Sequence, residues 1–171
     1  MMLNHENIQK GTGFPIAVPT ETVAIETRFG TYEFTPQNTV VMPQGLVGFA
    51  DQQLFGLANL PAPAPDDFKL LQSLGELPLS FIVMPVSPGE APIGPADIEE
   101  ACTATGVAPE TACFLFVVTI RAKANGNGID MTANLRAPIV FDPTTRLARQ
   151  HVFANSQYPL RHPVEKWDGQ V

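Results

Sequence analysis

Short apolar stretches, many of them rich in β-branched and aromatic residues, recur along this chain between clusters of glycine, proline, asparagine and aspartate. Stretches of this kind predict β-strands. Strands are expected at residues 22–29, 31–34, 39–42, 54–60, 68–74, 79–84, 112–121, 131–141 and 146–153. Since turn signals return roughly every eight to twelve residues, the pattern predicts an all-β (mainly β) fold, a closed or partly open barrel-like domain of short strands.

Three segments of this pattern carry more specific expectations. Residues 112–121 give the best strand signal and are expected at the centre of the sheet. Residues 131–141 are predicted as one strand, but Pro138 lacks a backbone donor and implies an edge position, a bulge or a strand start. Residues 43–49 hold two glycines with apolar residues between them, which predicts an ordered loop with Leu46 and Phe49 in the core.

One short helix is expected near residues 97–105. Asp97 is predicted as its N-cap, with Glu100 three residues later at the spacing of a capping box. Ile98 and Ala101 would then face inward, and Gly106 would end the helix.

The 171 residues fit a single domain at 21–164, with a flexible leader at 1–20 and a C-terminal tail at 165–171. Residues 1–10 are polar, so no signal peptide is recognised. The longest apolar run, around residues 114–120, is far shorter than the roughly 20 residues that span a bilayer. A cytoplasmic protein is therefore expected.

The formal net charge of −7 argues against general affinity for nucleic acid or for an anionic membrane. The acids gather in the middle of the chain, where Lys69 is the only basic residue between positions 51 and 110. Asp97, Glu99 and Glu100 would give the helix an acidic surface that attracts a basic protein. Alternatively, acids early in a helix simply complement the positive end of its dipole.

The sequence offers little for catalysis or for binding a cofactor or metal. His5, His151 and His162 lack the spacing of local metal ligands, and Cys102 and Cys113 form no Cys-x-x-Cys pair. No phosphate-binding glycine loop and no nucleophile elbow occur. We expect no enzyme, cofactor or metal, although a hydrolase that uses His151 or His162 remains an alternative, for example with Ser156, His162 and Asp168.

Five sequence blocks that occur in order resemble the FliW family of flagellar assembly factors across roughly residues 22–164. These blocks are Thr-Arg-Phe-Gly-Thr-Tyr-Glu at 27–33, Pro-Gln-Gly-Leu-Val-Gly-Phe at 43–49, Leu-Gln-Ser at 71–73, Met-Thr-Ala-Asn-Leu-Arg-Ala-Pro-Ile at 131–139 and Tyr-Pro-Leu-Arg-His-Pro at 158–163. The chain departs from the family pattern at Arg136, where an apolar residue is usual, and at Gln44, where Glu is frequent.

The resemblance implies a mostly β, barrel-like protein that acts by switching partners. Such proteins bind the RNA-binding regulator CsrA, relieve its repression of flagellin synthesis, and also bind flagellin, which releases CsrA. A chaperone for flagellin export that has lost the regulator is the alternative within the same class. Neither version binds nucleic acid or a membrane directly.

Candidate partner-binding residues follow from charge, exposed aromatic character and the family blocks. They are Glu99, Glu100, Met131, Asn134, Arg136 and Trp167. Asn134 is also expected to satisfy buried backbone groups beside Pro138. Trp167 would either anchor a partner or fold back against one end of the barrel.

Overall fold

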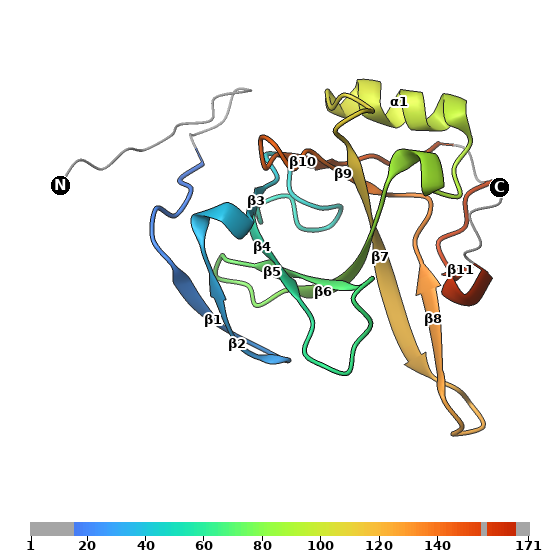
Figure 1. Ribbon diagram of the computed structural model, residues 1–171, viewed down its shortest axis with the longest axis horizontal. Helices are drawn as coiled ribbons and strands as arrows, with labels where there is room; N and C mark the ends of the chain where they lie inside the picture. Colours follow the sequence, from blue (N-terminus) through green and yellow to red (C-terminus); the bar gives the residue numbers. More distant parts are fainter. Residues whose placement is uncertain (1–15, 155–156, 167–171) are drawn as a thin grey trace.

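The computed structural model describes residues 16–154 and 157–166, and antiparallel strands dominate it (Figure 1). The strands are β1 (Val23–Thr27), β2 (Gly30–Phe34), β3 (Thr39–Val41), β4 (Leu54–Asn59), β5 (Lys69–Ser73), β6 (Ser80–Val86), β7 (Cys113–Ala122), β8 (Ile129–Ala133), β9 (Ile139–Phe141), β10 (Ala148–Gln150) and β11 (His162–Pro163). The helices are α1 (Pro95–Thr105) and the short 3-10 turns η1 (Pro36–Asn38), η2 (Pro88–Glu90) and η3 (Val164–Lys166). The mainly β prediction is thus confirmed.

A nine-stranded sheet curls into a partly open barrel in the order β10-β9-β7-β6-β5-β4-β3, with β8 paired to β7 and β11 paired to β8. Its two ends meet at one parallel bridge between Val41 and Leu147, where the Val41 N–H donates to the Arg146 carbonyl at 2.9 Å. Arg146 also donates from Nε to the Thr39 carbonyl at 2.9 Å. Because a bridge and not a strand ladder joins the ends, the described strands form no closed barrel.

Strand β7 is central, as predicted, because it pairs with β6 along one edge and with both β8 and β9 along the other. The prediction of one continuous strand over 131–141 is wrong. Ala133 pairs with Val118 and Ile139 pairs with Leu115, so residues 134–138 stand opposite Phe116 and Val117 alone. These residues form a bulge, and Pro138 directly precedes β9, where its missing donor costs no ladder bond.

The two faces of the sheet carry separate apolar cores. The inner cluster receives side chains from every strand along the curled path and fills the space that the sheet encloses. It consists of Val40, Met42, Leu46, Phe55, Leu71, Val83, Leu115, Ile139, Phe141 and Ala148. The outer cluster uses the alternate residues of β6 and β7, since successive strand residues point to opposite faces.

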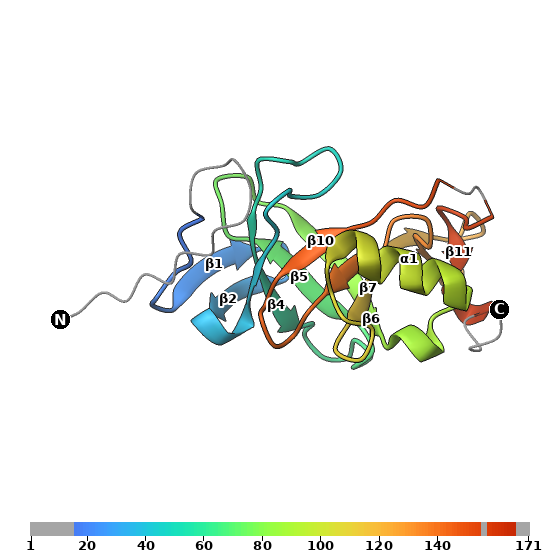
Figure 2. The ribbon, with the colours of Figure 1, turned by 90° about the horizontal axis from the view of Figure 1, so that it is seen from above.

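Helix α1 and the C-terminal segment cover the outer cluster at one end of the sheet, and the β1–β2 hairpin covers the other end (Figures 1 and 2). Ala101 is fully buried and Ile98 partly buried against this cluster, as predicted. On β2, Phe34 packs directly over Gly56, and a Cβ at Gly56 would overlap its ring. The loop at 43–49 also behaves as expected, with Leu46 buried and Phe49 partly buried against the inner cluster.

Helix α1 begins two residues earlier than predicted, so the N-cap prediction for Asp97 is wrong. Gly94 is the N-cap and Pro95 opens the helix, where its fixed φ suits the first turn and its missing N–H costs nothing. The end was predicted correctly, because Gly106 adopts a φ of 74° and its N–H donates to the Cys102 and Thr103 carbonyls. Among the described residues, no helix has the length and apolar character needed to cross a membrane.

Other boundaries shift less. The predicted strand at 146–153 shortens to β10, and β11 pairs with β8 in a segment where no strand was predicted. Most of the predicted leader at 1–20 and of the tail at 165–171 lies outside the described residues, so these domain boundaries stay predictions.

Candidate functional site

A hollow of about 340 Å³ opens where the bulge separates β8 from β9, and it brings the inner face of the sheet to the surface. We call it the mouth groove. It is lined by Leu46, Val47, Phe49, Phe81, Val117, Asn134, Arg136, Ala137, Gln150, Val152 and Leu160. Phe49, Phe81 and Val117 pack against the inner cluster, so the floor of the groove is continuous with the core.

Large apolar side chains around the mouth groove are unusually exposed. Val47 is 70% exposed, Leu160 55% and Val152 51%, although they come from three separate segments of the chain. Phe49 and Phe81 meet edge to face below them, with ring centroids 6.1 Å apart. Exposed apolar residues gathered over a hollow are typical of a surface that binds another protein.

Asn134 shapes one wall of the groove by organising the bulge. Its Oδ1 accepts the backbone N–H of Arg136 at 3.0 Å and that of Ala137 at 3.2 Å, while its own N–H donates to the Val117 carbonyl at 2.9 Å. The expectation that Asn134 satisfies backbone groups beside Pro138 is confirmed. These side-chain hydrogen bonds support the bulge where its ladder with β7 is interrupted.

The loop between β3 and β4 forms the opposite wall. Gly45 adopts a φ of 61° and lies so close to the backbone of Phe49 and Ala50 that a Cβ there would stand 2.8 Å from the Ala50 Cα. Leu46 and Phe49 exchange backbone hydrogen bonds, and the Val47 N–H donates to Oε1 of Gln150 at 2.8 Å. The last contact ties the loop to the end of β10, and both of its residues line the groove.

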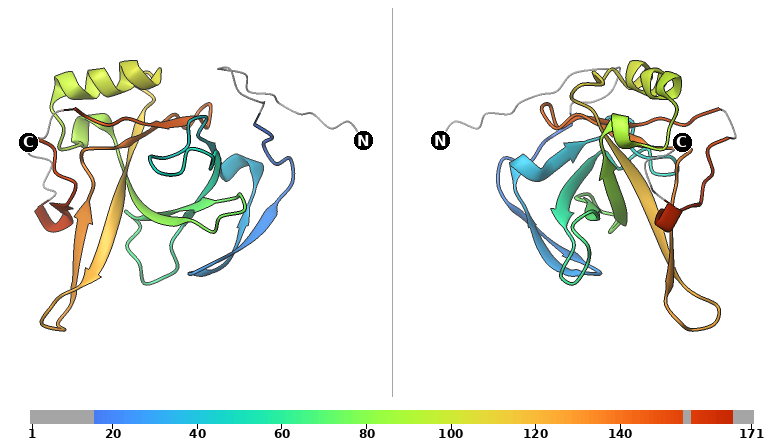
Figure 3. Two further views of the ribbon diagram at one scale, coloured as in Figure 1. Left: turned by 180° about the vertical axis from the view of Figure 1, so that it is seen from behind. Right: turned by 45° about the vertical axis from the view of Figure 1, so that its right-hand side comes forward.

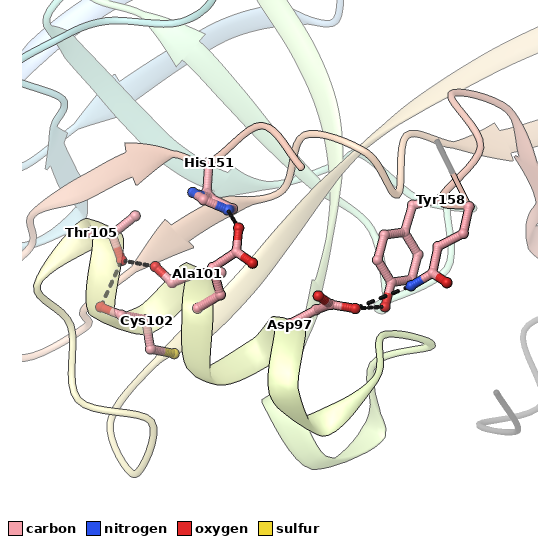
Figure 4. Close-up of polar contacts among 8 residues, drawn as sticks. Asp97, Ala101, Cys102, Thr105, His151 and Tyr158 are labelled. Atoms are coloured by element: carbon pink, nitrogen blue, oxygen red, sulfur yellow. Dashed lines mark hydrogen bonds and ion pairs between the residues drawn. The ribbon is translucent and has the colours of Figure 1, made fainter. Parts of the chain in front are cut away.

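A second network joins the bulge to helix α1 through Tyr158, whose contact with Asp97 is drawn in Figure 4. Arg136 donates from Nε to the Tyr158 carbonyl at 3.0 Å. The Tyr158 hydroxyl donates to Oδ2 of Asp97 at 2.5 Å and accepts the Gly94 N–H at 3.0 Å. Burial raises the pKa of the Tyr158 phenol, and the hydrogen bond to Asp97 raises this pKa further. Asp97 thus ties α1 to the C-terminal segment.

The outward face of α1 is acidic. Glu99 and Glu100 are both exposed, and the helix contains no basic residue. Oε1 of Glu100 lies 3.1 Å from Nε2 of His151 (Figure 4). The His151 ring packs edge-on against Phe153, with centroids 4.9 Å apart. The carboxylate of Glu100 therefore has a structural partner, whereas Glu99 extends from the surface.

The structure unites only some of the predicted binding residues. Asn134 and Arg136 lie together in the mouth groove, and Glu99 and Glu100 lie on α1. Met131 lines a different hollow on the outer face, and Trp167 lies outside the described residues.

Sequence reasoning missed the exposed apolar residues that dominate the mouth groove. Val47 stands between Gly45 and Gly48, and Leu160 follows Pro159 in a segment with no regular secondary structure. A large apolar residue inside a turn is a usable signal of an exposed apolar surface, because a turn normally leaves its side chains in solvent. Val152 offered no such signal, since it was assigned to a predicted strand.

The histidines and cysteines of the described part of the chain lie in separate segments of the fold. His151 contacts Glu100, His162 lies on β11, and both Ser156 and Asp168 of the alternative triad lie outside the described residues. Burial raises the pKa of the Cys102 and Cys113 thiols, which disfavours the nucleophilic thiolate. Residues 16–154 and 157–166 contain no group of three potential metal ligands.

We expect Tyr158→Phe to lower the free energy of unfolding by about 1–2 kcal/mol, because it removes the hydrogen bond to the Asp97 carboxylate and leaves the Gly94 N–H without its acceptor. Folding raises the pKa of this phenol, so its contribution to the free energy of unfolding is constant below the ordinary pKa of about 10. That contribution is lost as the pH rises through the raised pKa of the folded state. Urea unfolding from neutral to alkaline pH should therefore show a steeper alkaline loss in the wild type than in Tyr158→Phe. Equal pH slopes would contradict the assignment.

Comparison with known proteins places the chain in a family. The model of the FliW protein family matches residues 23–164. A flagellar assembly factor FliW from Syntrophotalea carbinolica is 34% identical over 143 residues, which cover 82% of this chain and 96% of the relative. A flagellar assembly factor FliW from Desulfitobacterium hafniense is 32% identical over 143 residues, which cover 81% of this chain and 88% of the relative.

The fold agrees with these matches. A crystal structure of the flagellar assembly factor FliW superposes with a TM-score of 0.60 at 24% identity and covers 83% of this chain and 96% of that one. The family match spans the sheet, the bulge, α1 and β11, and therefore both walls of the mouth groove. The chain belongs to the FliW family of flagellar assembly factors.

Proposed function

We propose that this chain is a non-enzymatic, cytoplasmic assembly factor that binds a CsrA-type RNA-binding regulator and flagellin in alternation. Binding to the regulator relieves repression of flagellin synthesis, and accumulated flagellin displaces the regulator. The observation that carries the proposal is the mouth groove, with its exposed Val47, Val152 and Leu160 above a floor continuous with the core.

Flagellin is the proposed occupant of the mouth groove. A subunit that polymerises buries apolar surface against its neighbours, and this surface is exposed before assembly. An apolar groove with a few fixed polar groups, such as Asn134 and Gln150, suits such a surface. Binding there would shield the apolar surface of the subunit until export.

The regulator is proposed to dock on the acidic face of α1. Its RNA-binding surface is basic, and Glu99 and Glu100 project from a helix without basic residues. Opposite charges steer the encounter and weaken it as salt rises. The regulator would contact α1 through residues beside its own RNA-binding surface. The assembly factor itself, with a formal net charge of −7, would bind no nucleic acid.

The hydrogen bonds through Tyr158 offer a physical route for coupling the two sites. Arg136 belongs to the mouth groove and holds the Tyr158 backbone, while the Tyr158 hydroxyl holds Asp97 on α1. A partner that displaces the bulge would also disturb the position of α1. Since coupling is reciprocal, each partner would lower the affinity for the other by the same factor.

Isothermal calorimetry with the regulator and the flagellin of the same organism tests the proposal at two salt concentrations. We expect Val47→Asp to weaken flagellin binding by about tenfold, because a charge replaces a desolvated apolar contact. Leu77→Asp, at an exposed apolar residue outside the groove, is the control. The double variant Glu99→Gln, Glu100→Gln should weaken regulator binding and reduce its salt dependence, whereas Glu21→Gln, Glu33→Gln should not.

The outcomes separate the alternatives. Binding of flagellin without any binding of the regulator would leave a dedicated export chaperone. Binding of both with no mutual displacement would contradict the partner switch, and binding of neither would contradict the proposal as a whole. If the switch operates, Tyr158→Phe should reduce the factor by which flagellin lowers the affinity for the regulator.

A further inference from the structure

A second hollow, of about 580 Å³, lies on the outer face of the sheet, on the opposite side from the inner cluster that floors the mouth groove. Phe68, Met84, Val86 and Met131 give it an apolar lining, and Asp67 and Glu90 supply two carboxylates. We call these six residues the acidic groove. Both carboxylates are exposed at its rim, on the β4–β5 loop and on η2.

The apolar lining continues outward along the β7–β8 hairpin. Ile120 pairs with Met131 and Ala122 pairs with Ile129, so these side chains share the face that carries the buried Val118 and Ala133 at the base of the hairpin. Ile120 is 42% exposed and Ile129 55%. The hairpin projects well beyond the body of the molecule in every side view (Figures 1 and 3).

Charge is distributed unequally between the two faces of this hairpin. Arg121 and Asp130 pair on the opposite face, and Lys123 lies 3.8 Å from the Asp130 carboxylate. The face that continues the acidic groove carries no charge of its own. Among the described residues that line the acidic groove, two are acidic and none is basic. The surface thus combines an apolar floor with a purely negative rim.

We propose that the acidic groove and the apolar face of the β7–β8 hairpin bind a segment of another protein that carries large apolar side chains flanked by lysine or arginine. The apolar side chains replace water over Met131, Ile129 and Ile120, and the basic side chains lie against Asp67 and Glu90. A purely apolar occupant would leave both carboxylates partly desolvated without partners, and an acidic one would be repelled. This surface is separate from the mouth groove and from the exposed acids of α1.

Selection of short random peptides displayed on phage, with the full chain as target, tests the ligand chemistry. An enriched peptide is then synthesised and its affinity measured by fluorescence anisotropy. We expect enriched sequences that combine aromatic or aliphatic residues with lysine or arginine. Asp67→Asn, Glu90→Gln should weaken binding by about threefold to tenfold and flatten its salt dependence. Asp51→Asn, Glu76→Gln, which removes the same charge around another hollow, should leave the affinity unchanged.

Ile129→Ser tests the hairpin, with Leu77→Ser as the matched control at a comparably exposed apolar residue. Weaker binding of the peptide to Ile129→Ser alone supports the proposal. The proposal is overturned by enriched sequences without basic residues, by equal effects of the two acid-to-amide pairs, or by an affinity that Ile129→Ser does not change. Because no flagellar protein enters this experiment, its failure is distinguishable from failure of the partner switch.

Discussion

Replacing Gly45 by alanine is expected to lower the free energy of unfolding by about 2–4 kcal/mol, the largest effect expected for any single substitution considered for this protein. Two costs combine at this position. Residues that carry a Cβ rarely adopt a φ of 61°. The added methyl group would also overlap the Phe49 carbonyl and crowd the Ala50 backbone. Backbone atoms cannot rotate aside as a side chain can, so the loop itself must shift.

The same substitution should impair the mouth groove, because the shifted segment carries Leu46, Val47 and Phe49. Gly48→Ala is the matched control, since Gly48 also has a positive φ, of 86°, but its added Cβ would meet nothing within 4 Å. Urea unfolding should show a loss of about 1 kcal/mol for Gly48→Ala, from backbone conformation alone. Equal losses for the two variants would mean that steric contact with residues 49–50 is unimportant.

Much of the fold could be predicted because local pattern and tertiary structure agree in most strands. The β1–β2 hairpin follows from β-branched residues on both sides of Gly30, and the central place of β7 follows from an apolar run that contacts both cores. The end of α1 follows from Gly106, whose left-handed conformation is cheapest for glycine. In each case, residues nearby in sequence suffice to predict the feature.

The errors occur where distant contacts decide the outcome. Asp97 has the side chain of an N-cap, but Pro95 starts the helix earlier and Tyr158, far away in sequence, engages the carboxylate. The period-2 pattern of 131–141 concealed the bulge, because apolar residues on both sides of it still alternate. The candidate binding residues Asn134 and Arg136 were selected through a family block, whereas Val152 reaches the mouth groove only through tertiary folding.

The bulge therefore connects the fold to the proposed function, since one feature breaks the ladder along β7, forms a wall of the mouth groove and holds the segment that reaches α1. The Asn134 side chain replaces part of the interrupted sheet bonding in the bulge. We expect Asn134→Ala to lower the free energy of unfolding by about 2–3 kcal/mol, because the N–H groups of Arg136 and Ala137 both lose their acceptor.

Asn125→Ala provides the control for this substitution. The Asn125 side chain likewise accepts a backbone N–H, that of Asn127 at 3.0 Å, but in an exposed turn where water can replace it. In the same urea titration, Asn125→Ala should lower the free energy of unfolding by less than about 1 kcal/mol. Hydrogen exchange followed by NMR locates the effect, since Asn134→Ala should speed exchange at Arg136 and Ala137 while Asn125→Ala should not. Unchanged protection of both amides would show that β7 and Tyr158 hold the bulge without the Asn134 side chain.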